Sequence, residues 1–465
     1  MGCAASIQPQ DNYVFRIADE NDKKQNNNNN NSGMKGGDSV NLDKKKRIKE
    51  KYKAELLEKR QNGGNKVQRS KTVSAGSNKH GTGASGGVSD IQPGRRNSSP
   101  HDNRLRRENA RKKFKRAGTI VKAAVRFKRG RDPKNWIGEG ISIRGGKFKL
   151  DDFTVERKPL GKGSAGFVKL AKHNGDKCYY ALKLVSKEKV VKHKNGPKHL
   201  QNEKRILEML DNPFFIKCFG TFQDPRFVYF VLNYIVGGEL HRLLFVQKRF
   251  SNDMAMFYST ELLCAIKHLH SLNIMYRDLK PENILIDMDG HVVLCDLGFS
   301  AEMDDDGRCH TKVGTPHYLA PEILDMHSNA GYTKAIDIWS WALVTYEMLR
   351  GRPAFGTAHD TAYQVYLRVM KAKYKMPNDI TSTAKSLIRK LLTAKIGNRL
   401  TEIDEIKEHR WFENVDWKGV EQRRLQPPHF PDIKGSGDRQ AYEIRLKVPN
   451  YRKVTLQEDV HFVGF

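Results

Sequence analysis

Hydrophobic positions are sparse over residues 7–150 of the chain and become dense and patterned from Phe153 onward. Between Phe153 and about Val236 the pattern favours strands, most clearly in the runs Tyr179–Val185 and Val228–Val236. The pattern therefore predicts that a globular domain begins near Phe153 and that its first part is rich in strands.

Helical periods dominate after Val236, as in the series Phe257, Leu262, Ile266 and Leu269. An exception is Ile284–Cys295, where two short apolar runs flank an Asp289-Gly290 turn, a pattern that predicts a β-hairpin. A strand-rich part followed by a helix-rich part indicates an α+β fold with two lobes. The hinge between the lobes is expected near Asn233–Gly238.

Residues 7–150 have the composition of a disordered extension. They contain the run Asn26–Asn31, Gly- and Ser-rich stretches such as Gly81–Gly87, and few large apolar side chains. Such a segment cannot bury enough surface to offset the entropy lost on ordering. Leu42–Arg60 is at best a solvated helix, because its apolar stripe is thin.

The positive charge of the chain is mostly a property of this extension. The 465 residues include 83 Lys and Arg against 53 Asp and Glu, a formal net charge of +30. Residues 1–150 hold 36 of the basic residues and only 14 of the acidic ones. A basic segment of this kind attracts anionic membranes or nucleic acids. Nucleic acid ranks low, because no recognition module or aromatic stacking platform accompanies the charge.

Membrane-spanning and secreted classes are excluded on composition. The longest apolar stretch, Phe227–Val236, has ten residues, whereas a membrane-spanning helix needs roughly 18 or more. Six scattered cysteines without a C-x-x-C pair, and the lack of a secretory leader, point to a reduced, intracellular setting.

The segment Gly161-Lys-Gly-Ser-Ala-Gly166-Phe-Val168 fits the pattern G-x-G-x-x-G-x-V, in which backbone N–H groups can approach phosphates. Taken alone, an ordinary flexible hairpin explains it as well. Lys183, in the strand-like Ala181-Leu-Lys, could reach the same phosphates, and an ion pair from Glu203 could fix its ammonium. Taken singly, a surface lysine and a surface glutamate are the commoner interpretation.

The most specific segment is Tyr276-Arg-Asp-Leu-Lys-Pro-Glu-Asn283, which matches H-R-D-L-x-x-x-N with Tyr in the first place. Asp278 would accept or orient the proton of an attacking hydroxyl, and Lys280 would lie near the transferring phosphoryl group. Asn283 and Asp296, the latter in Asp296-Leu-Gly298, would bind Mg²⁺. Turn chemistry is the alternative for these residues, but the ordered spacing of all the elements argues against it.

Together these motifs resemble the eukaryotic protein-kinase domain over about residues 153–412, and Ala320-Pro-Glu322 and Asp337-Ile-Trp-Ser340 fit the same pattern. Tyr276-Arg-Asp, Gly314–Glu322, His409-Arg-Trp-Phe412 and Phe462-Val-Gly-Phe465 are similar to the AGC group of serine/threonine kinases. Within it the likeness is greatest to the catalytic subunits of cyclic-AMP-dependent kinase, with cyclic-GMP-dependent kinases next.

The resemblance implies a bilobal kinase fold, with an antiparallel small lobe plus a helix (153–232) and a mainly helical large lobe (236–412). An acylation signal (1–6) and the basic disordered region (7–150) would precede it, and an AGC-type extension (413–465) would follow. It implies ATP and Mg²⁺ as cofactors. The implied ATP-binding set is Gly161, Lys162, Gly163, Ser164, Gly166, Val168, Ala181, Lys183, Glu203, Leu232, Asn233, Ile235, Glu239, Glu282 and Asn283.

The resemblance also implies how substrates would be chosen. Glu239, Glu282 and Glu347 match acidic positions that bind substrate arginines, so Arg-Arg-x-Ser/Thr-like protein substrates are expected. Thr315 matches a residue that helps to position the catalytic Asp. Lys312 stands where an apolar residue usually borders the pocket for the residue after the acceptor, which leaves that preference open.

Regulation is implied as well. Thr311 stands at the activation-loop phosphothreonine, and Arg277 with His199 would form its phosphate pocket. Ala301 and Glu302 replace basic residues there, which weakens the pocket. Candidate partners are a separate regulatory subunit and an upstream activating kinase. Arg399 is expected to pair with Glu322.

Other departures from the family pattern are local. Leu297 replaces Phe in the metal-binding triplet, a size-preserving swap. Asn233 replaces a hinge glutamate, which leaves backbone contacts to adenine intact. The tail after Gly435-Ser-Gly-Asp438 lacks the acidic, aromatic segment that covers the nucleotide in relatives, and Tyr442 is only a weak candidate to replace it. Phe462 and Phe465 are expected to dock in the small lobe.

Met1-Gly-Cys-Ala-Ala-Ser6 fits the pattern for N-myristoylation at Gly2, with Cys3 placed for palmitoylation. Stable anchoring takes two signals, so two acyl chains or one chain with the basic extension would hold the protein at the cytoplasmic face of a membrane. Otherwise it would be cytoplasmic. Arg95-Arg-Asn-Ser98 has the expected substrate form and makes Ser98 a candidate phosphosite, with Thr119 a looser match.

Two other classes remain as alternatives. A membrane-associated pseudokinase or scaffold would keep the fold and lose the reaction, although Lys183, Glu203, Asp278, Asn283 and Asp296 are all present. A nucleic-acid-binding protein is the more distant alternative.

Overall fold

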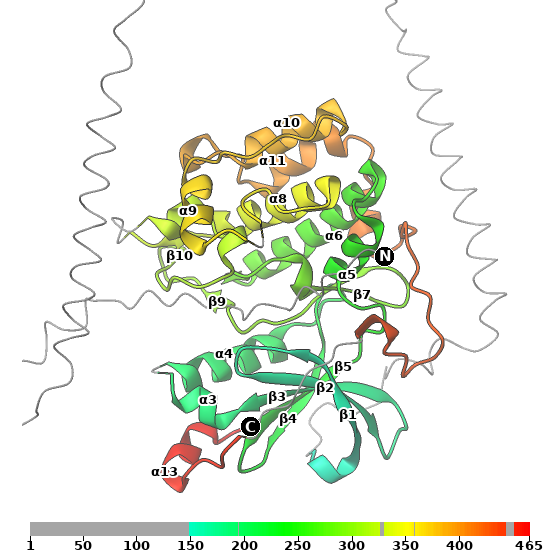
Figure 1. The fold of residues 1–465 in the computed structure, drawn as a ribbon, viewed down its shortest axis with the longest axis vertical. Coiled ribbons are helices and arrows are strands. Elements are labelled where there is room, and N and C mark those ends of the chain that lie inside the picture. The colour runs from blue at the N-terminus through cyan, green and yellow to red at the C-terminus, as the bar shows by residue number, and fades with distance from the viewer. Residues whose placement is uncertain (1–147, 194, 326–329, 358, 443–450) are drawn as a thin grey trace, which may run out of the picture. The chain divides into compact units, whose positions relative to one another are not determined.

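The computed structural model in Figure 1 describes residues 148–193, 195–325, 330–357, 359–442 and 451–465, which all belong to one compact unit of the chain. The expectations for the acylation signal, the basic extension, the helix Leu42–Arg60 and Ser98 concern residues outside this description. None of the described helices is both long and apolar enough to cross a membrane.

The strand-rich part forms an antiparallel five-stranded sheet in the order β1-β2-β3-β5-β4 (Figure 1). Its strands are β1 (Phe153–Lys162), β2 (Gly166–His173), β3 (Tyr179–Ser186), β4 (Cys218–Gln223) and β5 (Phe227–Asn233). The short helix η3 (Leu150–Asp152) precedes the sheet, and helices α3 (Lys187–Val191) and α4 (Gly196–Met209) follow β3. Pro159 lies on the edge strand β1 between two register shifts, where its missing N–H is tolerated.

The predicted strand Tyr179–Val185 is confirmed as β3, whereas the predicted strand Val228–Val236 is too long, because β5 ends at Asn233. Asn233 pairs with Tyr180 near the beginning of β3, so the neighbouring strand offers little further to pair with. The Asn233 side chain also accepts a hydrogen bond from the Lys217 N–H at 2.8 Å. The apolar residues Tyr234–Val236 therefore form the hinge segment and not a strand.

The second part is mainly helical. Its helices are α5 (Leu240–Gln247), α6 (Asn252–Ser271), α7 (Pro321–Leu324), α8 (Ala335–Arg350), α9 (Ala362–Met370), α10 (Ser382–Leu391), α11 (Ile403–Glu408) and α12 (Trp417–Glu421). Short 3₁₀ turns are η4 (Pro281–Asn283), η5 (Pro316–Tyr318), η6 (Ile396–Asn398) and η7 (Arg410–Phe412). Ser251 begins α6 by accepting from the Met254 N–H, and Gly351 ends α8 in a left-handed conformation.

Three small strand pairs accompany these helices: β6 (Ile274–Met275) with β9 (Ala301–Glu302), β7 (Ile284–Ile286) with β8 (Val292–Leu294), and β10 (Arg308–Cys309) with β11 (Tyr332–Thr333). The β7–β8 pair confirms the predicted hairpin, and Gly290 in its turn has a φ of +89°. The two-lobed α+β fold class is confirmed.

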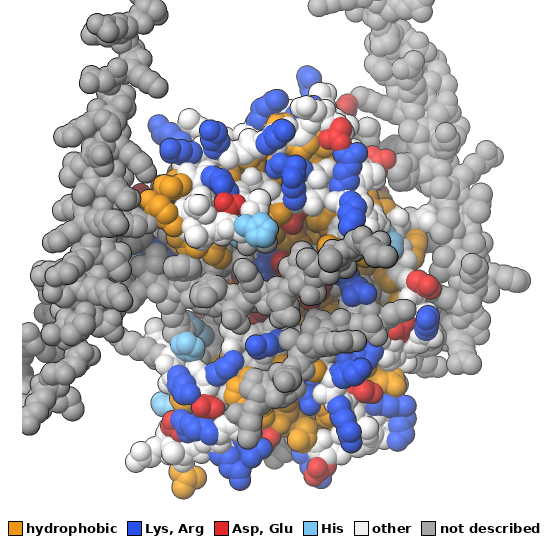
Figure 2. Space-filling view, in the orientation of Figure 1, with side chains coloured by type: hydrophobic (Ala, Val, Ile, Leu, Met, Phe, Trp, Pro, Cys, Tyr) orange, Lys and Arg blue, Asp and Glu red, His pale blue; other side chains and the backbone are white. Residues whose placement is uncertain are grey.

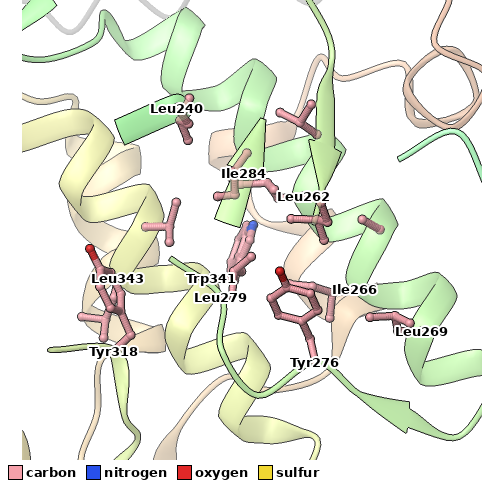
Figure 3. Close-up of a cluster of buried hydrophobic side chains, with 14 of the residues drawn as sticks. Leu240, Leu262, Ile266, Leu269, Tyr276, Leu279, Ile284, Tyr318, Trp341 and Leu343 are labelled. Carbon is pink, nitrogen blue, oxygen red and sulfur yellow. The ribbon is translucent and has the colours of Figure 1, made fainter. Parts of the chain in front are cut away.

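The core of the large lobe lies between α6 and α8. Helix α8 is buried at every residue except Arg350, and its polar side chains, Asp337 and Glu347 among them, are buried together with the apolar ones. Figure 3 shows Tyr276, Leu279 and Ile284 among side chains of α6 and α8. The loop that carries Asp278 is therefore built on packed hydrophobic residues.

The C-terminal segment returns to the small lobe through η8 (Gln440–Tyr442), α13 (Leu456–Asp459) and η9 (Val460–Phe462), and Figure 1 places α13 beside the small-lobe sheet. Phe462 is fully buried, and the Lys187 ammonium lies 5.0 Å from its ring centre. Lys187 also donates to Asp459 Oδ1 at 2.5 Å. The Phe465 ring packs at 6.1 Å from Phe230. The predicted docking of both phenylalanines is confirmed.

Candidate active site

The Lys183 side chain joins the two lobes. Its ammonium donates to Glu203 Oε1 on α4 at 2.5 Å and to Asp296 Oδ1, from the large lobe, at 2.9 Å. Burial alone would lower the pKa of Lys183, but Asp296 and Glu203 outweigh it and raise the pKa. Lys183 in turn holds the pKa of Asp296 below its usual range. Burial raises the pKa of Glu203, and Lys183 opposes that shift. The charged forms of Lys183 and Asp296 are therefore the favoured ones, which suits a lysine expected to bind phosphate and a carboxylate expected to bind a metal.

The three glycines of the loop between β1 and β2 differ in their surroundings. A Cβ added to Gly166 would lie 1.7 Å from the Leu184 carbonyl oxygen, so packing in the sheet requires glycine there. A Cβ added to Gly161 or Gly163 would meet no described atom within 4 Å. Lys162 and Ser164, on either side of Gly163, are exposed. The first two glycines therefore leave open backbone that a phosphate can approach.

Asp278 lies at the centre of a hydrogen-bond cluster. Lys280 Nζ donates to Asp278 Oδ2 at 2.7 Å, and the Thr315 hydroxyl donates to Asp278 Oδ1 at 2.7 Å. Lys280 also donates to Thr315 Oγ1 at 2.9 Å. Burial raises the pKa of Asp278, and Lys280 and Thr315 oppose that shift. The carboxylate is thus oriented by two donors and poised to take a proton.

Asn283 and Asp296 fit a magnesium ion. The Asn283 amide nitrogen donates to the Asp278 carbonyl and carboxylate oxygens at 2.9 and 3.0 Å, so the amide oxygen is the atom able to face a cation. Among the described residues no group of three or more His, Cys, Asp or Glu side chains could hold a metal ion. Mg²⁺ is commonly held by one or two protein carboxylates with substrate phosphates completing the shell, which matches this pair.

The loop Tyr276–Asn283 carries Asp278, and we call it the catalytic loop; Asp337 of α8 holds it in place. Its buried carboxylate accepts from the Tyr276 N–H at 2.9 Å and from the Arg277 N–H at 2.8 Å, and lies 2.8 Å from His270 Nε2. The Tyr276 hydroxyl donates to the Cys295 carbonyl, beside Asp296. Sequence analysis noted Asp337 only as part of a motif, and its role as anchor of the loop was missed.

The segment that contains Thr311 and ends at Glu322, the activation segment, is held in place by hydrogen bonds around Thr311. Arg277 Nη1 donates to Thr311 Oγ1 at 2.7 Å and to the Tyr332 hydroxyl at 3.0 Å. His199 lies on α4 and is half-buried, and its predicted part in a phosphate pocket stays a prediction. Glu302, which stands where the family pattern has a basic residue, forms an ion pair with Arg205 of α4.

Two further contacts anchor the end of this segment. Lys312 Nζ donates to the Asp325 carbonyl at 3.0 Å. Arg399 donates two hydrogen bonds to the Glu322 carboxylate, at 2.7 and 2.8 Å, which confirms the predicted pair.

The hinge segment contacts the C-terminal tail. Ala181 and Leu232, both buried, are paired across β3 and β5, and Val168 on β2 is half-buried. The Tyr442 hydroxyl donates to the Ile235 carbonyl at 2.6 Å. Tyr442 therefore lies at the hinge, a position that sequence analysis did not assign to it. The only signal for it was an aromatic residue shortly after Gly435-Ser-Gly-Asp438.

Three glutamates gather near the catalytic loop. Burial raises the pKa of Glu239 and of Glu347, the latter to about 7, and repulsion from Glu282 adds to both shifts. Glu282 itself is exposed, whereas Glu347 is buried and accepts from the Tyr318 hydroxyl at 2.6 Å. The negative charge of Glu282 therefore contributes to the raised pKa of both Glu239 and Glu347.

Comparison with known proteins identifies the family. Residues 154–412 match the family model described as protein kinase domain. The chain is 40% identical over 309 residues to the cAMP-dependent protein kinase catalytic subunit PRKX of Homo sapiens, covering 66% of this chain and 84% of that protein. It is 39% identical over 303 residues to cAMP-dependent protein kinase type 3 of Saccharomyces cerevisiae, covering 64% and 74% of the two chains.

The chain therefore belongs to the protein kinase family. Its activity is that of a protein serine/threonine kinase that uses ATP and Mg²⁺ and acts on protein substrates. Within the family it is of the type of the cAMP-dependent catalytic subunits. When bound, Mg·ATP would supply the phosphoryl group. Lys183, Asn283 and Asp296 would hold it, and Asp278 would accept the proton of the reacting hydroxyl.

Glu203→Gln should lower kcat/KM for ATP by about 100-fold, because loss of the ion pair releases Lys183 and small misplacements of a catalytic group have effects of that size. Steady-state kinetics at varied ATP measure the loss. Glu208→Gln, an exposed change on the same helix, is the matched control and should stay within about twofold of wild type. Equal activity of Glu203→Gln and wild type would contradict the role of the ion pair.

Proposed function

We propose that this kinase phosphorylates serine or threonine in Arg-Arg-x-Ser/Thr-like sequences. The observation that carries the proposal is the set of Glu239, Glu282 and Glu347 beside the loop of Asp278. Carboxylates pair with guanidinium groups through two parallel hydrogen bonds, which favours arginine in the substrate. The Asp278 carboxylate then receives the proton of the acceptor hydroxyl, while Lys280 and Thr315 hold its orientation.

Wild-type protein should transfer labelled γ-phosphate from Mg·ATP to a peptide containing Arg-Arg-x-Ser. Asp278→Asn should lower kcat by about 10²–10⁴, the range for removal of a general base, whereas Asp253→Asn, an exposed change on α6, should not. Replacing either substrate arginine with alanine should lower kcat/KM by about 10–100-fold, since each loses charge-assisted hydrogen bonds. Absence of transfer even from Thr311-phosphorylated protein would favour the scaffold alternative.

The pKa of Glu347, raised to about 7 by burial and by Glu282 against the Tyr318 hydrogen bond, makes arginine binding depend on pH. Raising the pKa of a carboxyl group favours its neutral form, so Glu347 gains charge as pH rises through 7. The KM for the Arg-Arg peptide should therefore increase about tenfold between pH 8 and pH 6, because the ionised fraction of Glu347 falls by that factor. Glu347→Gln should show a high KM that is flatter with pH. An equally steep profile in the variant would contradict the assignment.

We also propose that the N-terminus anchors the kinase at the cytoplasmic face of a membrane. Gly2 and Cys3 fit acylation patterns, and the excess of basic residues in 1–150 supplies a second signal. A regulatory subunit and an upstream kinase acting on Thr311 are proposed as partners, with Ser98 as a further phosphosite.

Protein produced with an N-myristoyltransferase should gain the mass of one myristoyl chain and sediment with vesicles of phosphatidylcholine and phosphatidylserine. Gly2→Ala should lack the added mass and should bind at least about tenfold more weakly, because it loses the burial of the acyl chain. Gly33→Ala, which leaves the pattern unchanged, is the matched control. Equal sedimentation of the Gly2→Ala protein and wild type would contradict the anchor.

A further inference from the structure

The tip of the glycine-rich loop is tied to helix α3. Lys189 Nζ donates to the Ser164 carbonyl at 2.8 Å, and the Ser186 N–H, at the beginning of α3, donates to the Ala165 carbonyl at 2.8 Å. Both carbonyl groups at the tip are thus held by one short segment, Ser186–Lys189.

These bonds fix the direction of a loop N–H group. A peptide unit is planar and trans, so its N–H points opposite to its carbonyl. With the Ser164 carbonyl drawn toward Lys189, the Ala165 N–H points away from Lys189. Backbone N–H groups of a glycine-rich loop bind phosphates only when they face the ligand, so the lysine selects one orientation of this peptide.

Lys189 is itself held by the C-terminal tail. Its ammonium lies 5.4 Å from the ring centre of Tyr451. A cation above the face of an aromatic ring is attracted by the electron density of the ring. The Tyr451 ring is in turn packed against Phe167 of β2 at 6.4 Å and Phe227 of β5 at 5.4 Å.

The tail on both sides of Tyr451 is anchored to the small lobe. The Arg452 N–H donates to Glu188 Oε2 at 3.1 Å, and the Val454 N–H donates to the Pro225 carbonyl at 3.1 Å. Tyr451 is buried, and its hydroxyl oxygen has no hydrogen-bond partner among the described residues. The part of Tyr451 that holds Lys189 is therefore its ring and not its hydroxyl group.

We propose that Lys189 and Tyr451 are positioning residues for ATP: the tail holds Lys189 through the Tyr451 ring, and Lys189 holds the glycine-rich loop in the form that binds phosphates. The inference rests on the proposed role of Gly161–Gly166 as the phosphate-binding loop. It gives the C-terminal tail an effect on nucleotide binding that is separate from the docking of Phe462 and Phe465.

The test compares Lys189→Met, Tyr451→Leu and Tyr451→Phe with wild type. Lys189→Met keeps the aliphatic stem and removes the ammonium, and it should raise the KM for ATP about tenfold with kcat within twofold, since a saturating ligand restores the loop. Tyr451→Leu should raise it about threefold. Tyr451→Phe keeps the ring and loses only an unpartnered hydroxyl, so it should match wild type. Lys198→Met on α4 is an exposed control.

A second readout needs no nucleotide. Amide hydrogen exchange over residues 161–167 in the free protein should be faster in Lys189→Met and Tyr451→Leu than in wild type, and unchanged in Tyr451→Phe. A third readout measures nucleotide binding without phosphoryl transfer. The dissociation constant of Mg·ADP, measured by calorimetry, should rise in Lys189→Met and Tyr451→Leu in parallel with their KM for ATP.

Three results would overturn the inference: an unchanged KM and unchanged exchange in Lys189→Met, equal effects of Tyr451→Phe and Tyr451→Leu, or a fall in kcat and melting temperature with no change in KM. A wild-type protein that transfers no phosphate would instead mean that the proposed function is wrong, so the two failures are distinct.

Discussion

The ion pairs of Lys183 are the constraint on which the rest of the site depends. One half-buried ammonium pairs with two carboxylates, the buried Glu203 on helix α4 and the exposed Asp296 on the large lobe. Because the same ammonium binds both carboxylates, the position of α4 and the approach of the two lobes are energetically linked. Glu203 is reached only if α4 packs against the sheet, and Asp296 only if the cleft is closed to this distance. The geometry around Lys183 therefore depends on the position of α4 and on the distance between the lobes.

The catalytic loop is specified by a second buried carboxylate. Arg277 and Asp296 both have positive φ, 69° and 56°, a conformation that costs roughly 1–2 kcal/mol for a residue with a side chain. At Arg277 the cost is offset by the hydrogen bond from its N–H to Asp337 and by side-chain bonds to Phe299 and Thr311. The apolar residues beneath the loop, seen in Figure 3, fix its backbone. The strained backbone at the site is thus supported by α8, a helix buried over nearly its whole length.

The C-terminal tail contacts the small lobe at three functional places: the hinge through Tyr442, helix α3 through Tyr451, and α4 through Phe465, whose ring lies 5.3 Å from Lys204 Nζ. On the face shown in Figure 2, Lys and Arg side chains are spread over both lobes. The ammonium groups of Lys187, Lys189 and Lys204 instead lie over aromatic rings of the tail. These three lysines therefore help to hold the tail in place.

The sequence by itself determined the order of the two lobes, strand β3, the β7–β8 hairpin and the identities of Lys183, Glu203, Asp278, Asn283 and Asp296. The elements follow from local hydrophobic periodicity, and the residues follow from the spacing within and between short motifs. Both can be read along the chain without knowing how it folds. It placed the end of β5 too late, because an apolar run does not reveal where the neighbouring strand ceases to pair. Only the tertiary structure decided that Asp337 supports the loop, that Glu302 meets Arg205, and that Tyr442 and Tyr451 reach the hinge and α3. Those partners are separated by 60 to more than 200 residues, so only the packed path of the chain brings them together.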